Sequence, residues 1–329
     1  MKIKGKLVAL VDADVVAFRA SAATEKRQVQ VLHKPSGKVK LFDTRTEFKE
    51  RLQEKGASDK INDYEFTDVQ SPAVFKITQN TVDSLVNKIG QALEPDSLEL
   101  YVGGKGNFRD NLPLPSKYKG NRDTMLRPIN LKETKKYLQN KLGAEVVNGI
   151  EVDDMVSIRA YEELAKGNTP VICTNDKDTN QAEGVYVYDW TTEGSSPILI
   201  PELGYVKLNK NNAIKGEGLK FFASQLILGD ASDHYKPTEV STARFGAKSA
   251  VKLLDPLVDS KSVLEAVVAR YKEWYPDVVT YNTWSGTEIT TNWEGMLDIY
   301  YSFAYMLRSR NDKTTWKEFF IERGWNESK

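Results

Sequence analysis

The chain has 329 residues, of which 40% are hydrophobic and 28% charged, and its 46 Lys and Arg balance its 46 Asp and Glu. This composition supports one large domain or two of ordinary size, and the formal net charge of +0 does not indicate a polyanionic partner. No run of about 18 apolar residues occurs, which excludes a membrane span, and the single Cys173 excludes a disulfide framework and a cysteine-based zinc cluster.

Short β-branched apolar runs alternate with helical patterns over the first half of the chain. The runs predict buried strands at Leu7–Val11, Leu98–Val102, Val171–Cys173 and Val185–Tyr188. The segments between them predict helices at about 78–93, 130–142 and 152–165. This alternation indicates an α/β fold with a parallel sheet flanked by helices.

Two segments depart from the alternation. In residues 25–66, QVQVL and KVKLF flank HKPSG, which predicts a β-hairpin with a turn at Pro35–Gly37. A charged helix is expected at about 45–55, and we interpret 25–66 as an insertion in an α/β unit. After about residue 210 the strand signals fade, and KFFASQLILG, SAVKLL, SVLEAVVARYKEWY and MLDIYYSFAYMLRS predict a helical C-terminal region.

Acidic residues follow the predicted strands where those strands end. They are Asp12 and Asp14, then Glu151, Asp153 and Asp154, then Asp176 and Asp178, with a further pair, Asp230 and Asp233, after a predicted helix. Such strand ends gather at one edge of a parallel sheet. Two carboxylates about 4 Å apart repel by roughly 4 kcal/mol at an effective dielectric near 20, and carboxylate-only sets suit Mg²⁺ or Mn²⁺. We therefore predict a metal site, although each acid taken alone also fits a helix cap or a turn.

A basic segment lies at residues 105–142, which hold ten Lys or Arg against three acids, with aromatic residues between them. This combination suits a nucleic-acid backbone and its bases. Prolines and a glycine make its first part a loop, whose candidate nucleic-acid contacts are Arg109, Lys117, Lys119 and Arg122. The lysines from Lys132 to Lys141 fit a solvated helix face better. Gly246, just before a predicted helix and close to Lys248, is a second candidate phosphate site.

Several of these stretches together resemble the 5′-nuclease (flap endonuclease) superfamily, and most closely phage-encoded 5′–3′ exonucleases. They are VDADVVAFRAS, NFRDNLPLPSKYKGNR, GIEVDDM, TNDKD and LILGDASDHY followed by FGAKSA, in family order over roughly residues 7–255. The resemblance implies a PIN-like parallel sheet with helices on both faces. It also implies a catalytic domain at 1–210, with 105–142 as a basic arch or clamp, and a helical region at 211–329 with a helix–hairpin–helix element that grips DNA.

The resemblance also implies roles for individual residues. Metal ligands would be Asp12, Glu151, Asp153, Asp176, Asp178 and Asp233, with Asp154 and Asp230 as further acids of the cluster. Lys119 and Arg122 would act catalytically on the scissile phosphate, and Tyr118 would stack on a terminal base. Gly246 and Lys248 would belong to the DNA-binding hairpin, where the family often holds a monovalent cation such as K⁺.

The sequence departs from the family pattern at two places. Gly103 and Gly104 stand where the family has an Asp, so one of two divalent ions should be weakly held unless Asp14 or Asp110 substitutes. A Gly104→Asp change is then expected to tighten that ion. The stretch HYKPTEVSTARF is longer than usual and lacks the expected Gly-rich turn, which would weaken or reshape the grip on duplex DNA.

The expected activity is hydrolysis of DNA near a 5′ end, flap or nick with two Mg²⁺ or Mn²⁺ ions, by a cytoplasmic, monomeric protein of a phage-infected cell that could work beside replication proteins. Three alternatives stay open. They are an RNA-primer-removing nuclease of the same fold, a nuclease-weak nucleic-acid binder, and a phosphatase or small-nucleotide hydrolase that would have no use for the basic segment.

Overall fold

The computed structural model describes residues 1–326 and divides into two compact units. Of the described residues, the first unit contains 1–14, 89–125 and 143–326, and the second contains 15–88 and 126–142. Residues 143–326 therefore belong to one unit without a break near 210. The predicted division by function, into a catalytic domain at 1–210 and a helical DNA-binding region at 211–329, stays a prediction. Within the described residues, no helix combines the length and the apolar character that a membrane crossing requires.

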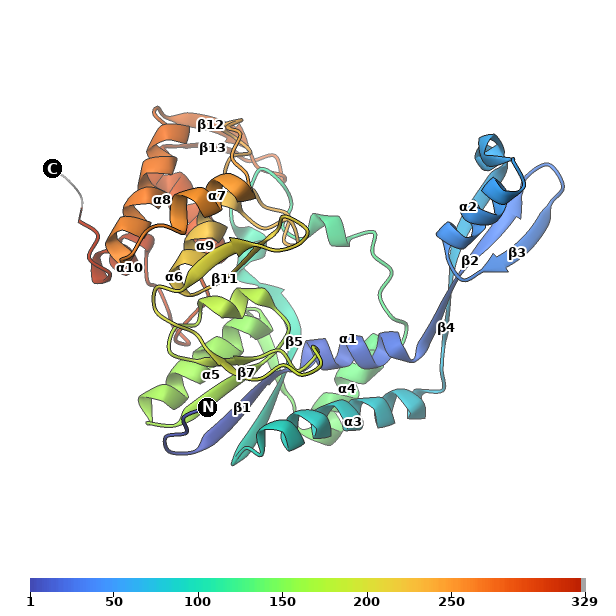
Figure 1. The fold of residues 1–329 in the computed structure, drawn as a ribbon, viewed down its shortest axis with the longest axis horizontal. Helices are drawn as coiled ribbons and strands as arrows, with labels where there is room; N and C mark the ends of the chain where they lie inside the picture. Colours follow the sequence, from blue (N-terminus) through green and yellow to red (C-terminus); the bar gives the residue numbers. More distant parts are fainter. Residues whose placement is uncertain (327–329) are drawn as a thin grey trace. The chain divides into compact units, whose positions relative to one another are not determined.

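A mainly parallel sheet forms the centre of the first unit, with the strand order β6-β5-β1-β7-β8-β9. Its strands are β1 (Leu7–Asp12), β5 (Ser97–Asn107), β6 (Glu145–Gly149), β7 (Thr169–Cys173), β8 (Tyr186–Tyr188) and the antiparallel edge strand β9 (Ile198–Leu199). All residues of β1 and β7 are buried, which explains their unbroken apolar sequence. Helix α5 (Val152–Ala165) packs against β1, β5 and β7 (Figure 1). The predicted α/β fold with a parallel sheet flanked by helices is confirmed.

The C-terminal part of the first unit is mainly helical and has an aromatic core. Its helices are α6 (Gly218–Leu228), α7 (Ala247–Leu254), α8 (Ser260–Trp274), α9 (Trp293–Ala304) and α10 (Trp316–Glu322). Fully buried Tyr271, Tyr300 and Phe320 lie in this core. Two short hairpins also occur here, β10 (Tyr205–Leu208) with β11 (Ile214–Glu217) and β12 (Val279–Asn282) with β13 (Glu288–Thr291). Helices predominate after residue 210, as predicted, and the short hairpins are strands that the sequence did not indicate.

The second unit contains the insertion. It comprises most of α1 (Ala13–Ala23) and α3 (Phe75–Leu93), all of α4 (Leu131–Leu142), and a small antiparallel sheet with the order β3-β2-β4. The strands are β2 (Glu25–His33), β3 (Lys38–Phe42) and β4 (Tyr64–Pro72). Helix α2 (Arg45–Glu54) begins at Thr44, whose hydroxyl accepts the N–H of Glu47 at 3.0 Å, and the 3-10 turn η1 (Ser58–Asp63) follows it. The predicted hairpin and helix are confirmed, and β4, which the sequence did not indicate, completes the sheet.

Candidate metal centre

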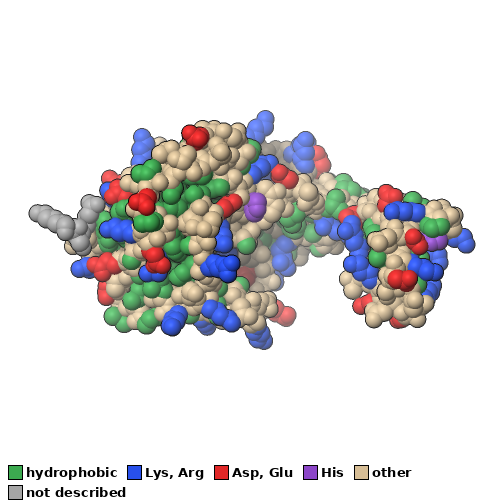
Figure 2. Space-filling model, turned by 90° about the horizontal axis from the view of Figure 1, so that it is seen from above, with side chains coloured by type: hydrophobic (Ala, Val, Ile, Leu, Met, Phe, Trp, Pro, Cys, Tyr) green, Lys and Arg blue, Asp and Glu red, His purple; other side chains and the backbone are tan. Residues whose placement is uncertain are grey.

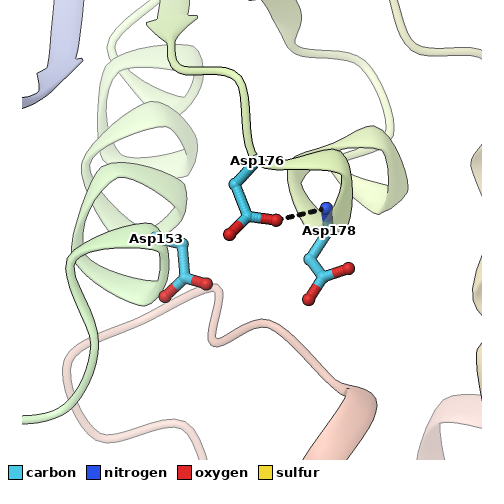
Figure 3. A group of neighbouring side chains, drawn as sticks. All are labelled: Asp153, Asp176 and Asp178. Carbon is cyan, nitrogen blue, oxygen red and sulfur yellow. Dashed lines mark hydrogen bonds between the residues drawn. The ribbon is translucent and has the colours of Figure 1, made fainter. Parts of the chain in front are cut away.

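Three carboxylates meet beyond the ends of the central strands. Asp153 lies in the first turn of α5, Asp176 in the loop after β7, and Asp178 in the 3-10 helix η4 (Lys177–Gln181). One oxygen of each lies within 4.8 Å of the others, and Figure 3 shows the three side chains next to one another. A compact set of oxygen ligands fits a hard divalent cation.

Hydrogen bonds hold these acids in place. The Asp178 N–H donates to Asp176 Oδ1 at 3.0 Å (Figure 3). The hydroxyl of Thr174, at the end of β7, donates to Asp12 Oδ2 at 3.1 Å and accepts the N–H of Asp176 at 3.1 Å. Gln225 of α6 donates from Nε2 to Asp178 Oδ1 at 2.6 Å. Asp12 is therefore tied to the same loop as the triad, through a threonine that the sequence reasoning did not single out.

Crowding and loss of water disfavour the charged state of most of these groups. Burial raises the pKa of Asp153 well above its ordinary value, and the neighbouring Glu151 and Asp154 raise it further. Burial, reinforced by Asp176, raises the pKa of Asp178 to about 6, and burial raises that of Asp233 to about 6. Such shifts mark a site with more carboxylates than its own cations stabilise, as expected where a metal ion would bind.

The basic loop at residues 117–123, which contains the turn η3 (Gly120–Arg122), contacts the loop at 230–234. The Lys119 N–H donates to the Asp233 carbonyl at 2.9 Å, and Asn121 Nδ2 donates to the Ala231 carbonyl at 2.9 Å. Lys119 has a φ of 52°, which few non-glycine residues adopt and which these contacts maintain. The two predicted motifs YKGNR and GDASD therefore form one surface.

Three side chains of this loop, two cationic and one phenolic, contact the carboxylates of Glu151 and Asp233. The Lys119 ammonium pairs with Glu151 and lies 3.8 Å from Asp233 Oδ1. Arg122 Nη2 lies 2.8 Å from Asp233 Oδ1. Burial raises the pKa of Glu151, but Lys119 and nearby Arg109 outweigh this effect, so its pKa is lowered. Tyr118 is buried and donates its hydroxyl to Glu151 Oε2 at 2.7 Å, so its ring is not available for the predicted stacking on a base.

A second lysine, which the sequence reasoning missed, lies within the TNDKD motif. Lys177 Nζ lies 3.1 Å from Asp178 Oδ1 and also pairs with Asp230. Asp230 is buried and forms reciprocal backbone hydrogen bonds with Tyr235. Lys177 thus links the η4 acids to the loop that carries Asp230. Its position between two acidic residues in the motif was the available sequence signal.

Arg109 and Asp154 form a buried pair away from solvent. Arg109 is 4% exposed and Asp154 0%. The two side chains make hydrogen bonds of 2.5 and 3.0 Å, and Arg109 also donates to the carbonyls of Phe303 at 3.0 Å and Tyr305 at 2.8 Å. In this arrangement Arg109 has no exposed group for nucleic acid, and Asp154 neutralises it. The pair joins α5 and the turn that follows β5 to the C-terminal segment in this structure, and the predicted DNA contact and metal ligation stay predictions.

The glycines that replace the family acid lie within β5, where its pairing with β6 becomes irregular between Gly103 and Asn107. A Cβ on Gly104 would lie 2.9 Å from the carbonyl oxygen of Val147 and 2.3 Å from Asn148 Oδ1. The neighbouring strand β6 fills this space, so any side chain at residue 104 would force β6 to shift; the effect of Gly104→Asp on ion binding stays a prediction. Asp14 lies close by, since its Oδ1 accepts the N–H of Gly103 at 3.0 Å, whereas Asp110 is exposed in the 3-10 turn η2 (Phe108–Asn111).

The remaining predicted contacts lie on the surface. Lys117 pairs with Asp123 at 2.6 Å, and Gly246 and Lys248 are exposed at the start of α7. A Cβ at Gly246 would meet open space, so the backbone does not require glycine there. Residues 229–246 connect α6 to α7, which pack together, but the helix–hairpin–helix assignment and the DNA contacts stay predictions.

Comparison with known proteins gives matches among solved structures alone. No protein-family model and no curated protein matches the chain. The structure is similar to the flap endonuclease of bacteriophage T5 in a pseudo-enzyme–product complex with DNA and metal ions, at 13% identity over 82% of this chain and 86% of that chain, with a TM-score of 0.45. It is also similar to T5 5′-exonuclease with bound zinc, at 16% identity over 82% and 86% of the two chains, with a TM-score of 0.41.

Proposed function

We propose that this protein is a divalent-metal-dependent 5′-nuclease, which hydrolyses phosphodiester bonds of DNA near a 5′ end, a flap or a nick. One observation carries the proposal. The triad of Asp153, Asp176 and Asp178 lies in the same unit as the loop of Lys119 and Arg122, and Asp233 contacts both of these cations. Acids that can hold metal ions beside cations that can hold a phosphate are what phosphodiester hydrolysis requires.

The triad fits a divalent ion because each of its three side chains offers a carboxylate oxygen. The raised pKa values of Asp153 and Asp178 show that these carboxylates lack sufficient positive charge nearby, which a bound cation would supply. When bound, such ions would activate water and neutralise charge on the phosphate. We assign the tighter of two ions to the triad. The weaker one would use Asp12, with Asp14 supplying the acid that Gly103 and Gly104 lack.

Lys119 and Arg122 would stabilise the charge that grows on the scissile phosphate. Their present partners are Glu151 and Asp233, and a phosphate could replace these carboxylates while metal ions neutralise the acids. Removing one preorganised contact of this kind costs roughly 2.7–4 kcal/mol in transition-state stabilisation. We therefore expect Lys119→Ala to lower turnover far more than DNA affinity.

Cleavage-product mapping tests the proposal. Labelled flap, nicked, single-stranded and RNA–DNA chimeric substrates are incubated with Mg²⁺ or Mn²⁺, with wild type and with Asp153→Asn. Short products released from the 5′ side, lost in Asp153→Asn and in EDTA, support a DNA 5′-nuclease. Asp43→Asn, a change of an exposed acid in the insertion, serves as the matched control and should cleave like wild type.

Each alternative has its own outcome in this assay. Cleavage confined to RNA strands would identify an RNA-primer nuclease. Binding without metal-dependent cleavage would identify a nuclease-weak binder. Hydrolysis of mononucleotides that is insensitive to salt, without cleavage of DNA, would point to a small-nucleotide hydrolase. Undiminished cleavage by Asp153→Asn would contradict the assignment of the triad.

A further inference from the structure

The insertion contains a pocket that the proposed nuclease site does not use. It lies in the second unit between α2 and one face of the small sheet, and water can enter a volume of about 240 Å³. Its floor includes the half-buried rings of Phe42 and Tyr64. The ring of Phe48 is buried and supports both of them, packing edge to face with centroids 5.1 and 4.8 Å away. The floor is thus apolar and aromatic, although the pocket is open to solvent.

Four cations surround this floor. Lys38 and Lys40 are two residues apart on β3 and so share one face of the sheet, while Arg51 and Lys55 lie one turn apart at the end of α2. All four are exposed. Among the described residues that line the pocket, none is acidic. Like charges gathered in this way disfavour folding unless an anion binds between them.

Arg51 has an acidic partner that lies outside the lining. Glu47 Oε1 accepts from Arg51 Nη2 at 2.7 Å, but both side chains face solvent, with 33% and 61% exposure. Exposed pairs of this kind are weak, so an anionic ligand can displace Glu47. The Arg51 guanidinium also lies 5.4 Å from the centre of the Phe42 ring. Arg51 therefore joins the cationic rim to the aromatic floor.

We infer that this pocket binds an unpaired strand of nucleic acid, with one base on the aromatic floor and its neighbouring phosphates on the cationic rim. The pocket is smaller than the roughly 300–1,000 Å³ of sites for drug-sized ligands, which suits a single planar base. Stacking on aromatic rings beside a positive groove is the common mode of single-strand binding. Duplex DNA offers phosphates but no free base face. The inference rests on the proposed function in one respect: the single strand would be an unpaired part of the DNA substrate that the nuclease cleaves.

The test measures binding of fluorescently labelled oligonucleotides to the full-length protein in EDTA, where cleavage does not interfere. The ligands are a short oligothymidylate, an abasic strand of equal length and a blunt duplex. The double variant Lys38→Glu, Lys40→Glu is compared with Lys49→Glu, Lys60→Glu, which makes the same charge change at exposed positions of the insertion outside the pocket. We expect the pocket variant to bind oligothymidylate roughly tenfold more weakly and its salt slope to fall by about 1.4, for two lost phosphate contacts.

The abasic strand tests the aromatic floor. Wild type should prefer oligothymidylate to the abasic strand, and the pocket variant should lose most of that preference. Equal weakening by the two double variants, equal affinity for the thymidylate and abasic strands, or equal loss of duplex binding would each overturn the inference. Competition by polyglutamate as effective as by oligothymidylate would show instead a general site for acidic chains.

A cleavage assay separates this inference from the proposed nuclease activity. On a nicked duplex without an unpaired tail, the pocket variant should cleave at the wild-type rate, whereas on a long flap its KM should rise. If wild type cleaves nothing, the proposed function fails, and the binding comparison in EDTA still decides whether the pocket holds a single strand.

Discussion

Replacing Asp178 with asparagine should stabilise the protein when metal is absent. Burial and the adjacent Asp176 raise the pKa of Asp178 to about 6, so its charged form is less favourable in the folded protein than in the unfolded chain. Asparagine has the same shape, and its oxygen can still accept the hydrogen bond from Gln225. Lys177 loses one charged partner but keeps Asp230.

The pKa gives the size and the sign of the effect. One pKa unit corresponds to about 1.4 kcal/mol, so ionised Asp178 costs the folded state up to roughly 3 kcal/mol. Because the folded pKa is raised, this cost is absent below about pH 4 and appears as the pH rises through about 6. Asp178→Asn should therefore raise Tm by roughly 2–6 °C at about pH 8 and have little effect at about pH 4.

Thermal unfolding in EDTA measures the stability change without metal, and unfolding in Mg²⁺ measures the stability that metal binding adds. Wild type should gain stability with Mg²⁺, by about 2.7 kcal/mol when the free ion is at 100 times Kd, while the variant should gain much less. Asp312→Asn is the control. Burial raises the pKa of Asp312, but hydrogen bonds to Thr314 and Arg308 lower it overall, so this variant should lose stability with and without metal. A Tm for Asp178→Asn at or below wild type in EDTA at about pH 8, or equal gains with Mg²⁺, would refute the reasoning.

Three further predictions concern packing and charge. Arg109→Met leaves Asp154 buried without its cation and should cost about 3–5 kcal/mol in urea unfolding, part of which a second change, Asp154→Leu, should restore. Gly104→Ala should destabilise by about 1–3 kcal/mol and speed hydrogen exchange in β6, because its Cβ would meet the Val147 carbonyl; unchanged exchange would contradict this packing. Burial alone would raise the pKa of Glu163, but hydrogen bonds from a lysine, an asparagine and an arginine lower it to about 2. Glu163→Gln should therefore cost up to about 3 kcal/mol at neutral pH, and this difference from wild type should vanish as the pH falls to about 2.

The sequence was most informative where a single local pattern decides the structure. Leu7–Val11 and Val171–Cys173 are buried on both faces, so continuous apolar runs marked them as central strands, and the acids that follow them could be placed at one sheet edge. The grouping of Asp153 with Asp176 and Asp178 agrees with that placement.

Features that depend on contacts between distant segments were not predictable in this way. The local sequence predicts Arg109 as an exposed basic residue of a loop. It is buried because it binds the carbonyls of Phe303 and Tyr305, which are distant in the sequence. Gly104 reads as a vacant ligand position, but the space beside it is filled by β6. The hairpins after residue 200 were missed because their strands are short and partly polar, which gives a weak period-two signal.

The carbonyls that Arg109 binds have a practical consequence for the design of shorter fragments. A protein cut near residue 210 would keep Arg109 and Asp154 but lose the backbone of Phe303 and Tyr305. The guanidinium would then lose two acceptors, and the apolar surface that faces the C-terminal helices would be exposed to water. Such a fragment is expected to aggregate, so its inactivity would not show that a DNA-binding element had been removed. Point substitutions in the intact chain are the sounder way to separate catalysis from DNA binding.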